Sequence, residues 1–119
     1  MKKQELAHWG EETAKKYLES RNVRLIQRNF RTQFGEIDLI GFENEDLVFF
    51  EVKTRSSTRF GFPEEAVDFR KIEKIEIVAN EFMDQQKLEN QNWRIDTIAI
   101  IRNPSNGRFE IKWFRNVDA

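Results

Sequence analysis

The sequence predicts a fold in the α/β to α+β range, with helices flanking a mixed central sheet. Two segments, residues 4–20 and 68–86, repeat apolar side chains at the three- and four-residue spacing of an amphipathic helix. Other, shorter segments either alternate apolar and polar side chains or are almost wholly apolar, as strands do. At 119 residues the chain is long enough for one core but not for two, so we expect residues 1–119 to form one domain.

The first half of the chain predicts one helix and three strands. The helix covers residues 4–20, and the stripe along it consists of Leu6, Trp9, Thr13, Ala14, Tyr17 and Leu18. Residues 23–31 mix apolar and basic side chains and predict a strand, and residues 36–40 predict a second, alternating strand. A polar turn over residues 43–46 then leads into residues 47–54, a third strand and one of the most apolar stretches of the sequence.

The second half predicts a loop, a helix and two strands. Residues 56–63 combine glycine, proline and several hydroxyl side chains, which is typical of a loop. Asp68 is placed to cap the amino end of the second helix, which continues to about residue 86. Residues 93–102 and 109–114 predict two strands joined by a turn that contains proline and glycine. The predicted order is therefore α-β-β-β-α-β-β.

The composition excludes some classes of protein. The chain has no cysteine, so it can form neither a disulfide framework nor a thiolate metal site. No apolar run approaches the roughly 20 residues of a membrane span, and the first residues lack the apolar core of a signal peptide. We therefore expect a cytoplasmic protein that does not bind membranes.

The charge is nearly balanced overall but unevenly distributed. The formal net charge is −1, which differs from the basic balance typical of nucleic-acid-binding proteins. Basic residues nevertheless cluster within residues 21–31, 52–59 and 70–74. Each cluster either builds a basic patch or is simply a solvated face, and the sequence leaves both interpretations open.

Two acidic side chains are predicted to face each other across the hairpin formed by the second and third strands. If the turn spans residues 43–46, Asp38 lies directly opposite Glu51, and Glu36 lies opposite Lys53. Like charges placed directly opposite one another destabilise a sheet, so Asp38 and Glu51 require a cation between them or a shared proton. A divalent ion such as Mg²⁺ suits two carboxylates and water. The alternative is a register shifted by one residue, or a sheet face that is simply solvated.

A third acid comes from the first helix. Glu11 lies on the flank of the apolar stripe, where it would lean over the sheet, whereas Glu12 lies on the solvent-facing side. Spacing alone favours an ion pair between Glu11 and Lys15 instead. A metal ion held by such carboxylates activates water and stabilises negative charge on phosphorus, which supports phosphodiester hydrolysis. Lys53 would orient or deprotonate the attacking water, and its structural alternative is a salt bridge to Glu36.

Several blocks of the sequence, in this order and at this spacing, closely resemble the YraN family of predicted endonucleases. The two central blocks are Gly35-Glu36-Ile37-Asp38-Leu39-Ile40 and Val48-Phe49-Phe50-Glu51-Val52-Lys53-Thr54-Arg55. The flanking blocks begin at Gly10-Glu11, Arg28-Asn29-Phe30-Arg31, Gly61 and Arg94-Ile95-Asp96, so the resemblance covers residue 8 to about residue 101. The family is similar to the restriction-endonuclease-like superfamily with its PD-(D/E)XK active site, and to archaeal Holliday-junction resolvases. The resemblance therefore implies a restriction-endonuclease-like fold.

The resemblance also implies a role for each matching residue. Asp38 and Glu51 would bind Mg²⁺ or Mn²⁺ directly, helped by the backbone carbonyl of Val52. Glu11 would complete the metal site through water, and Lys53 would serve the nucleophilic water. Together with the basic clusters, the resemblance places nucleic-acid contacts at Arg55, Lys71, Arg31 and Arg59.

These observations predict a metal-dependent endonuclease that hydrolyses phosphodiester bonds of DNA. The similarity to resolvases points to branched or structured DNA, during recombination or repair. Cutting both strands is simplest for a homodimer, and other DNA-processing proteins are candidate partners. One alternative is a non-catalytic nucleic-acid-binding or partner subunit that retains a nuclease-like site. Another is a structural or interaction domain that does not bind nucleic acid.

Overall fold

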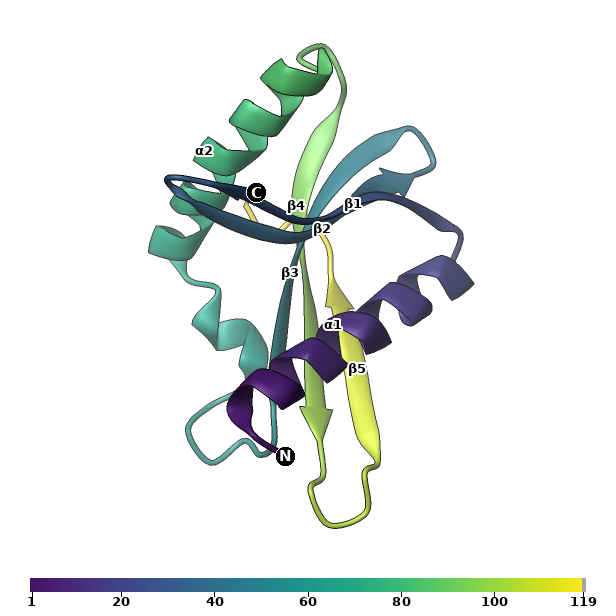
Figure 1. Ribbon diagram of the computed structural model, residues 1–119, viewed down its shortest axis with the longest axis vertical. Coiled ribbons are helices and arrows are strands. Elements are labelled where there is room, and N and C mark those ends of the chain that lie inside the picture. Colours follow the sequence, from purple (N-terminus) through teal and green to yellow (C-terminus); the bar gives the residue numbers. More distant parts are fainter. Residues whose placement is uncertain (119) are drawn as a thin grey trace.

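The computed structural model describes residues 1–118, and its elements are named as in Figure 1. They are, in chain order, α1 (Lys3–Ser20), β1 (Val23–Thr32), β2 (Gly35–Glu43), β3 (Asp46–Arg55), the 3₁₀ helix η1 (Pro63–Ala66), α2 (Phe69–Gln86), β4 (Trp93–Arg102) and β5 (Phe109–Phe114). The predicted order of helices and strands is confirmed. The difference is η1, which starts at the last residue of the predicted loop.

The strands of the described chain form one mixed sheet in the order β1-β2-β3-β4-β5. Neighbouring strands are antiparallel except β3 and β4, which are parallel and are connected through α2. The two long helices pack on opposite faces of this sheet, and Figure 1 shows α1 crossing in front of the strands while α2 lies to one side. This is the fold class that the sequence predicted.

The third strand is buried on both of its faces, which explains its nearly continuous apolar sequence. Leu47 and Phe49 pack with α2 in one core cluster, whereas Val48 and Phe50 pack with α1 in the other. Because side chains alternate along a strand, Glu51 follows Leu47 and Phe49 on the α2 face. The strand therefore carries a carboxyl group onto a face that is otherwise apolar.

Each long helix brings one candidate site residue to the sheet, Lys71 from α2 and Glu11 from α1. In α2, Asp68 caps the amino end by accepting a hydrogen bond from the backbone N of Lys71 at 3.1 Å, as the sequence predicted. In α1, a Cβ added at Gly10 would lie 1.9 Å from the hydroxyl oxygen of Thr54 in β3. Only glycine allows α1 to approach β3 this closely, which places Glu11 beside the strand.

Within residues 1–118, neither helix is long and apolar enough to cross a membrane.

The β2–β3 hairpin has the register that the sequence predicted, with a shorter turn. Glu43 pairs with Asp46, so two residues form the turn instead of four. Asn44, in the turn, has a left-handed φ of 54°, which asparagine tolerates better than most residues. The ladder ends at the pair Leu39 and Phe50, so Asp38 and Glu51 are the next residues beyond its last pair.

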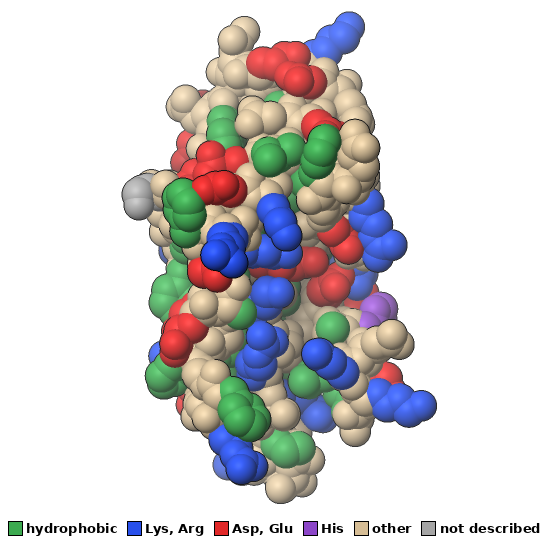
Figure 2. All heavy atoms as spheres, turned by 90° about the vertical axis from the view of Figure 1, so that its left-hand side faces the viewer, with side chains coloured by type: hydrophobic (Ala, Val, Ile, Leu, Met, Phe, Trp, Pro, Cys, Tyr) green, Lys and Arg blue, Asp and Glu red, His purple; other side chains and the backbone are tan. Residues whose placement is uncertain are grey.

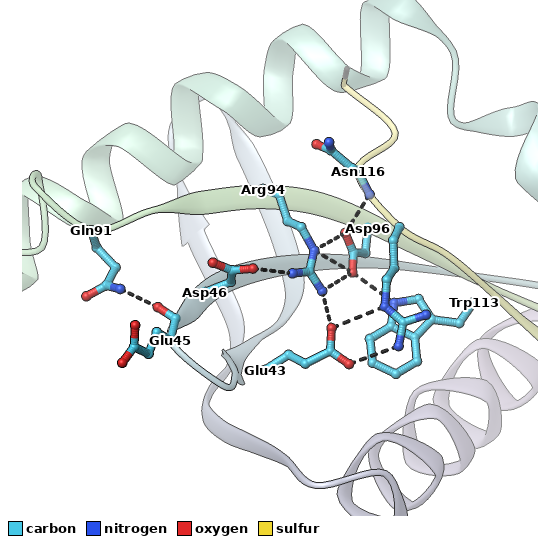
Figure 3. Close-up of polar contacts among 9 residues, drawn as sticks. Glu43, Glu45, Asp46, Gln91, Arg94, Asp96, Trp113 and Asn116 are labelled. Carbon is cyan, nitrogen blue, oxygen red and sulfur yellow. Dashed lines mark hydrogen bonds and ion pairs between the residues drawn. The ribbon is translucent and has the colours of Figure 1, made fainter.

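A network of ion pairs around the buried Asp96 fixes the turn end of this hairpin to β4 (Figure 3). The carboxylate of Asp96, which is fully buried, accepts hydrogen bonds from Arg94 Nε at 3.0 Å and from Trp113 Nε1 at 2.8 Å. Arg94 in turn donates to Asp46 at 2.8 Å and to Glu43, the two residues that flank the turn. Because one guanidinium bonds both sides of the turn, the network holds the register of the hairpin.

Replacing Arg94 by glutamine is expected to destabilise the fold far more than replacing Arg115, although both guanidinium groups bond Glu43. Arg94→Gln leaves the buried Asp96 without its ion-pair partner, which costs about 3–5 kcal/mol. Arg115 is half exposed, so Arg115→Gln is expected to cost about 1 kcal/mol or less. Urea denaturation followed by circular dichroism measures both free energies of unfolding. Equal losses for the two variants would show that this network does not hold the hairpin.

Candidate active site

The candidate site lies where β2 separates from β3. The last pair of the ladder between these strands is Leu39 with Phe50. Beyond it, the backbone N of Val52 donates to Asp38 Oδ2 at 2.8 Å, so the carboxylate takes the place of a strand partner. This hydrogen bond turns the Asp38 side chain toward β3.

The carboxyl groups of Asp38 and Glu51 lie close enough for each to shift the pKa of the other. Only 4% of Glu51 is exposed, and its Oε2 is buried with no hydrogen-bond partner among residues 1–118. Burial, reinforced by the charge of Asp38, raises the pKa of Glu51 to about 8. Burial also raises the pKa of Asp38. Because its pKa lies above 7, Glu51 holds a proton at neutral pH, which relieves the repulsion between the two carboxyl groups.

Two lysines flank the buried carboxyl group of Glu51. Lys53 Nζ lies 3.5 Å and Lys71 Nζ lies 3.7 Å from Glu51 Oε1. Both ammonium groups oppose the rise in the pKa of Glu51 without cancelling it. The predicted alternative partner of Lys53, Glu36, instead pairs with Arg31 at 3.1 Å. Lys53 is therefore directed at the acid pair rather than across the hairpin.

Glu11 of α1 leans over the sheet toward the same acids. Its carboxylate lies 3.9 Å from Arg28 Nε of β1. Burial raises the pKa of Glu11, and the negative charge of Asp38 adds to this rise. The alternative partner considered for Glu11, Lys15, pairs instead with Glu19 at 3.4 Å.

Glu12 also contacts β1, from the exposed side of α1. It accepts a hydrogen bond from Arg28 of β1, and this bond lowers the pKa of Glu12. The Glu12 side chain keeps 38% of its surface exposed, as the sequence predicted, and Arg28 lies within reach of both glutamates. Arg28 thereby fixes the turn of α1 that carries Glu11.

Asn29 of β1 is a site residue that sequence reasoning missed. It lies opposite Asp38 in the β1–β2 register and has a left-handed φ of 51°. With its amide nitrogen facing the acids, it donates to Glu11 Oε1 at 2.9 Å and to Glu36 Oε1 at 3.0 Å. A left-handed residue interrupts the alternation of a strand, so the pattern gave no signal. The one hint was its residue type, since asparagine is enriched at such positions.

Two carboxyl groups, rather than three, come close enough to ligate one ion. Within residues 1–118, no three Asp, Glu, His or Cys side chains form a group that could hold a metal. Asp38 and Glu51 are therefore the candidate direct ligands, and Glu11 is left to act through water. Mg²⁺ suits such a site because it commonly keeps several waters and binds one or two carboxylates. The role of the Val52 carbonyl stays a prediction.

Of the four basic residues predicted to contact nucleic acid, the structure brings Lys71 to the acid pair. Lys71 contacts the pair directly, and Arg31 is bonded to a neighbouring acid. Arg55 ends β3, and Arg59 lies on the following loop with its guanidinium 5.4 Å from the centre of the Phe60 ring. Figure 2 shows Lys and Arg side chains running down this face of the molecule, with acidic side chains at mid-height. Their contact with nucleic acid stays a prediction.

The fold and the site together define a class of protein. A five-stranded mixed sheet flanked by two helices, in this order of elements, is consistent with the restriction-endonuclease-like fold. Residues 10–100 match the model of the Uncharacterised protein family UPF0102, so the chain belongs to this family. The resemblance to the YraN family is thereby confirmed.

Individual relatives match over most of the chain. A UPF0102 protein of Caldicellulosiruptor saccharolyticus is 38% identical over 116 residues, which are 98% of this chain and 98% of that protein. One of Clostridium acetobutylicum is 37% identical over 108 residues, 91% of this chain and 88% of that protein. One of Syntrophomonas wolfei is 54% identical over 68 residues, 57% of this chain and 59% of that protein.

The proton on Glu51 makes the stability of the protein depend on pH. Glu51 has an ordinary pKa of 4.5 and a pKa of about 8 in the fold, so between these values the folded protein holds a proton that the unfolded chain has lost. The free energy of unfolding without added metal is therefore expected to fall as the pH rises from about 5 to about 8, by up to about 1.4 kcal/mol per pH unit. Glu51→Gln, which stays neutral, removes this fall and is expected to be more stable than the wild type at about pH 8.

Urea denaturation across this pH range measures the effect. Glu110→Gln is the matched control, because it removes the same charge at an exposed position on β5 and should keep the wild-type profile. A wild-type stability that is flat or rises between about pH 5 and about pH 8 would contradict a protonated acid pair.

Proposed function

We propose that this protein, with residues 1–119 acting as one nuclease domain, is a metal-dependent endonuclease that hydrolyses phosphodiester bonds of DNA. The observation that carries the proposal is the buried Glu51 beside Asp38, both with raised pKa values, with Lys53 Nζ 3.5 Å from Glu51. Groups with strongly perturbed pKa values, gathered with a charged partner, concentrate at functional sites. The family match covers all three residues and agrees with the resemblance to predicted endonucleases.

The donor set fits Mg²⁺ or Mn²⁺. Oε2 of Glu51 is buried and lacks a hydrogen-bond partner in the described chain, although a buried carboxyl oxygen normally has one. A cation between Asp38 and Glu51 would replace the proton of Glu51 and satisfy this oxygen. When bound, the ion would supply positive charge that polarises the scissile phosphate and lowers the pKa of water.

The two lysines have separate roles in this proposal. Lys53 lies two residues beyond Glu51 on the same strand face, where its Nζ would orient the attacking water and stabilise negative charge beside it. Lys71, whose Nζ is 3.7 Å from Glu51 in the absence of substrate, would bond a phosphate oxygen when DNA is bound. Both side chains are about one third exposed or less, which strengthens their attraction to phosphate relative to bulk water.

Glu11 and Asn29 would arrange water at the edge of the site. Among residues 1–118 no three acids form a group that could hold a metal, so the Glu11 carboxylate would hold a water rather than the ion. Asn29 donates to this carboxylate at 2.9 Å and therefore fixes its orientation. Such supporting contacts commonly decide how well a metal site is formed.

Branched or otherwise structured DNA is the substrate we favour. The support is the similarity of the sequence to resolvases, and a chain in which we find no motif that reads bases in a groove. A homodimer would bring one site to each strand, and other DNA-processing proteins are the partners expected for such an enzyme. We place the protein in the cytoplasm, where it would meet DNA.

One observation favours a second candidate function, a nucleic-acid-binding subunit with an idle nuclease-like site. Lys53 and Lys71 both lie within ion-pair distance of Glu51 Oε1 and already bring positive charge to this carboxyl group. A site neutralised by its own lysines could bind DNA without binding metal. This candidate predicts DNA binding that survives Asp38→Ala, with no cleavage by the wild type in Mg²⁺ or Mn²⁺.

A cleavage panel separates the two candidates. The substrates are single-stranded, duplex, flap and four-way DNA, each with and without Mn²⁺. Lys53→Ala is expected to reduce the rate of cleavage by about 100-fold or more, since it removes the group that positions the attacking water and stabilises negative charge beside it. Lys16→Ala removes the same charge from the exposed side of α1 and should leave the rate unchanged. Equal traces of cleavage by the wild type and Lys53→Ala would point to a contaminating nuclease and sink the assignment.

A further inference from the structure

A cavity of about 740 Å³ lies beside Glu11 and Lys53 of the candidate active site. It lies between the first half of α1 and the carboxyl ends of the parallel strands β3 and β4, and Figure 1 shows the start of α1 beside both strand ends. Ligands of sheets with parallel strands commonly bind outside the carboxyl ends of those strands. Glu11 and Lys53 line this cavity and belong to the candidate active site, so the cavity neighbours that site.

Positive charge dominates the wall of this cavity. Its basic lining residues are Lys3, Lys53, Arg55 and Arg102, whereas Glu11 is its one acidic lining residue among residues 1–118. Of the four cations, Lys53 alone pairs with an acid in the part of the chain that the structure describes. Three cations therefore face one cavity without a compensating charge, and this arrangement attracts an anion.

Arg102 gives independent evidence for a bound anion. Its Nε is buried and has no hydrogen-bond partner among residues 1–118. Its guanidinium lies 5.0 Å from the centre of the Trp9 ring, so an aromatic face supports the group without using its hydrogen-bond donors. A phosphate oxygen would accept charge-assisted hydrogen bonds from this guanidinium, which has no acidic partner among residues 1–118.

We propose that this cavity binds a phosphate of a single DNA strand, next to the phosphate that is cleaved. This rests on the proposed function, because the shared residues Glu11 and Lys53 are what place the two phosphates side by side. Cavities of about 300–1,000 Å³ hold ligands of small-molecule size, so this one accepts about one nucleotide and excludes a double helix. Leu6 and Ala7 add apolar surface for the sugar and base. The substrate is therefore unpaired beside the cleaved bond, as it is at a flap or a fork.

Fluorescence anisotropy with a labelled single-stranded oligodeoxynucleotide, in the absence of divalent metal, tests this subsite. Arg102→Gln is expected to weaken binding about tenfold and to reduce the slope of log K against log salt by about 0.7, the change for one lost phosphate contact. Lys112→Gln removes the same charge from an exposed position on β5 and should bind as the wild type does. Lys3 lies at the exposed start of α1. Lys3→Gln should also weaken binding of the oligonucleotide, and it tests the subsite even if Arg102→Gln disturbs the packing on Trp9.

Two further arms identify the ligand. A duplex of the same length is expected to bind equally to the wild type and to Arg102→Gln, because it cannot enter the cavity. Deoxythymidine monophosphate is expected to compete about 100-fold less well than the oligonucleotide, which has additional phosphates to bind. Equal loss of affinity for single strand and duplex, or a mononucleotide that competes as well as the strand, would overturn the proposal. So would equal affinities of Arg102→Gln and Lys112→Gln for the single strand.

The subsite and the nuclease activity can fail separately. If the wild type cleaves no DNA in Mn²⁺ while Arg102→Gln still weakens single-strand binding, the strand-binding cavity stands and the proposed function falls. If the wild type cleaves flap DNA and Arg102→Gln cleaves it as fast as Lys112→Gln does, the subsite falls and the proposed function stands.

Discussion

The burial of Glu51 is the constraint on which the rest of the site depends. The strand that carries it is covered by α2 on one face and by α1 on the other, so its carboxyl group has little access to water. An ionised carboxylate in such a place is costly, and a second carboxyl group in contact with it adds to the cost. The structure reduces this cost by holding a proton on Glu51 and by placing two ammonium groups nearby.

Three distant features hold this arrangement in place. The Arg94 network fixes the turn of the β2–β3 hairpin and with it the register that brings Asp38 beside Glu51. The absence of a side chain at Gly10 lets α1 lie against β3, and this contact brings Glu11 to the site. The cap of α2 fixes the first turn of that helix, from which a lysine reaches Glu51. The site is thus a product of packing at both ends of the sheet.

Much of the fold could be predicted from local patterns. Helical periodicity, strand alternation and polar turns act over a few residues, so they located the helices and strands and placed Asp38 beside Glu51. The predicted turn was too long. Polar residues at the end of a strand resemble turn residues in the sequence, and only their long-range partners distinguish the two. In this hairpin, that partner is Arg94, 48 residues from Asp46 in the chain.

The parts of the site that could not be predicted all depend on contacts between distant segments. Asn29 acts from a left-handed position in β1, and Arg28 of the same strand reaches both glutamates of α1. The cavity beside Glu11 and Lys53 is formed by segments from the beginning, middle and end of the chain, with Arg102 as its least predictable member. No local pattern marks such a cavity, since each contributing residue is ordinary in its own element.

The account of the site implies that a proton and a divalent ion compete for the same two carboxyl groups. Calorimetric titration with Mn²⁺ at about pH 7, in two buffers of different ionisation enthalpy, counts the protons released when the ion binds. Because the pKa of Glu51 is about 8, the wild type is predicted to release about one proton per ion, and Glu51→Gln close to none. Binding of Mn²⁺ to the wild type without proton release, or no binding at millimolar Mn²⁺, would contradict the account.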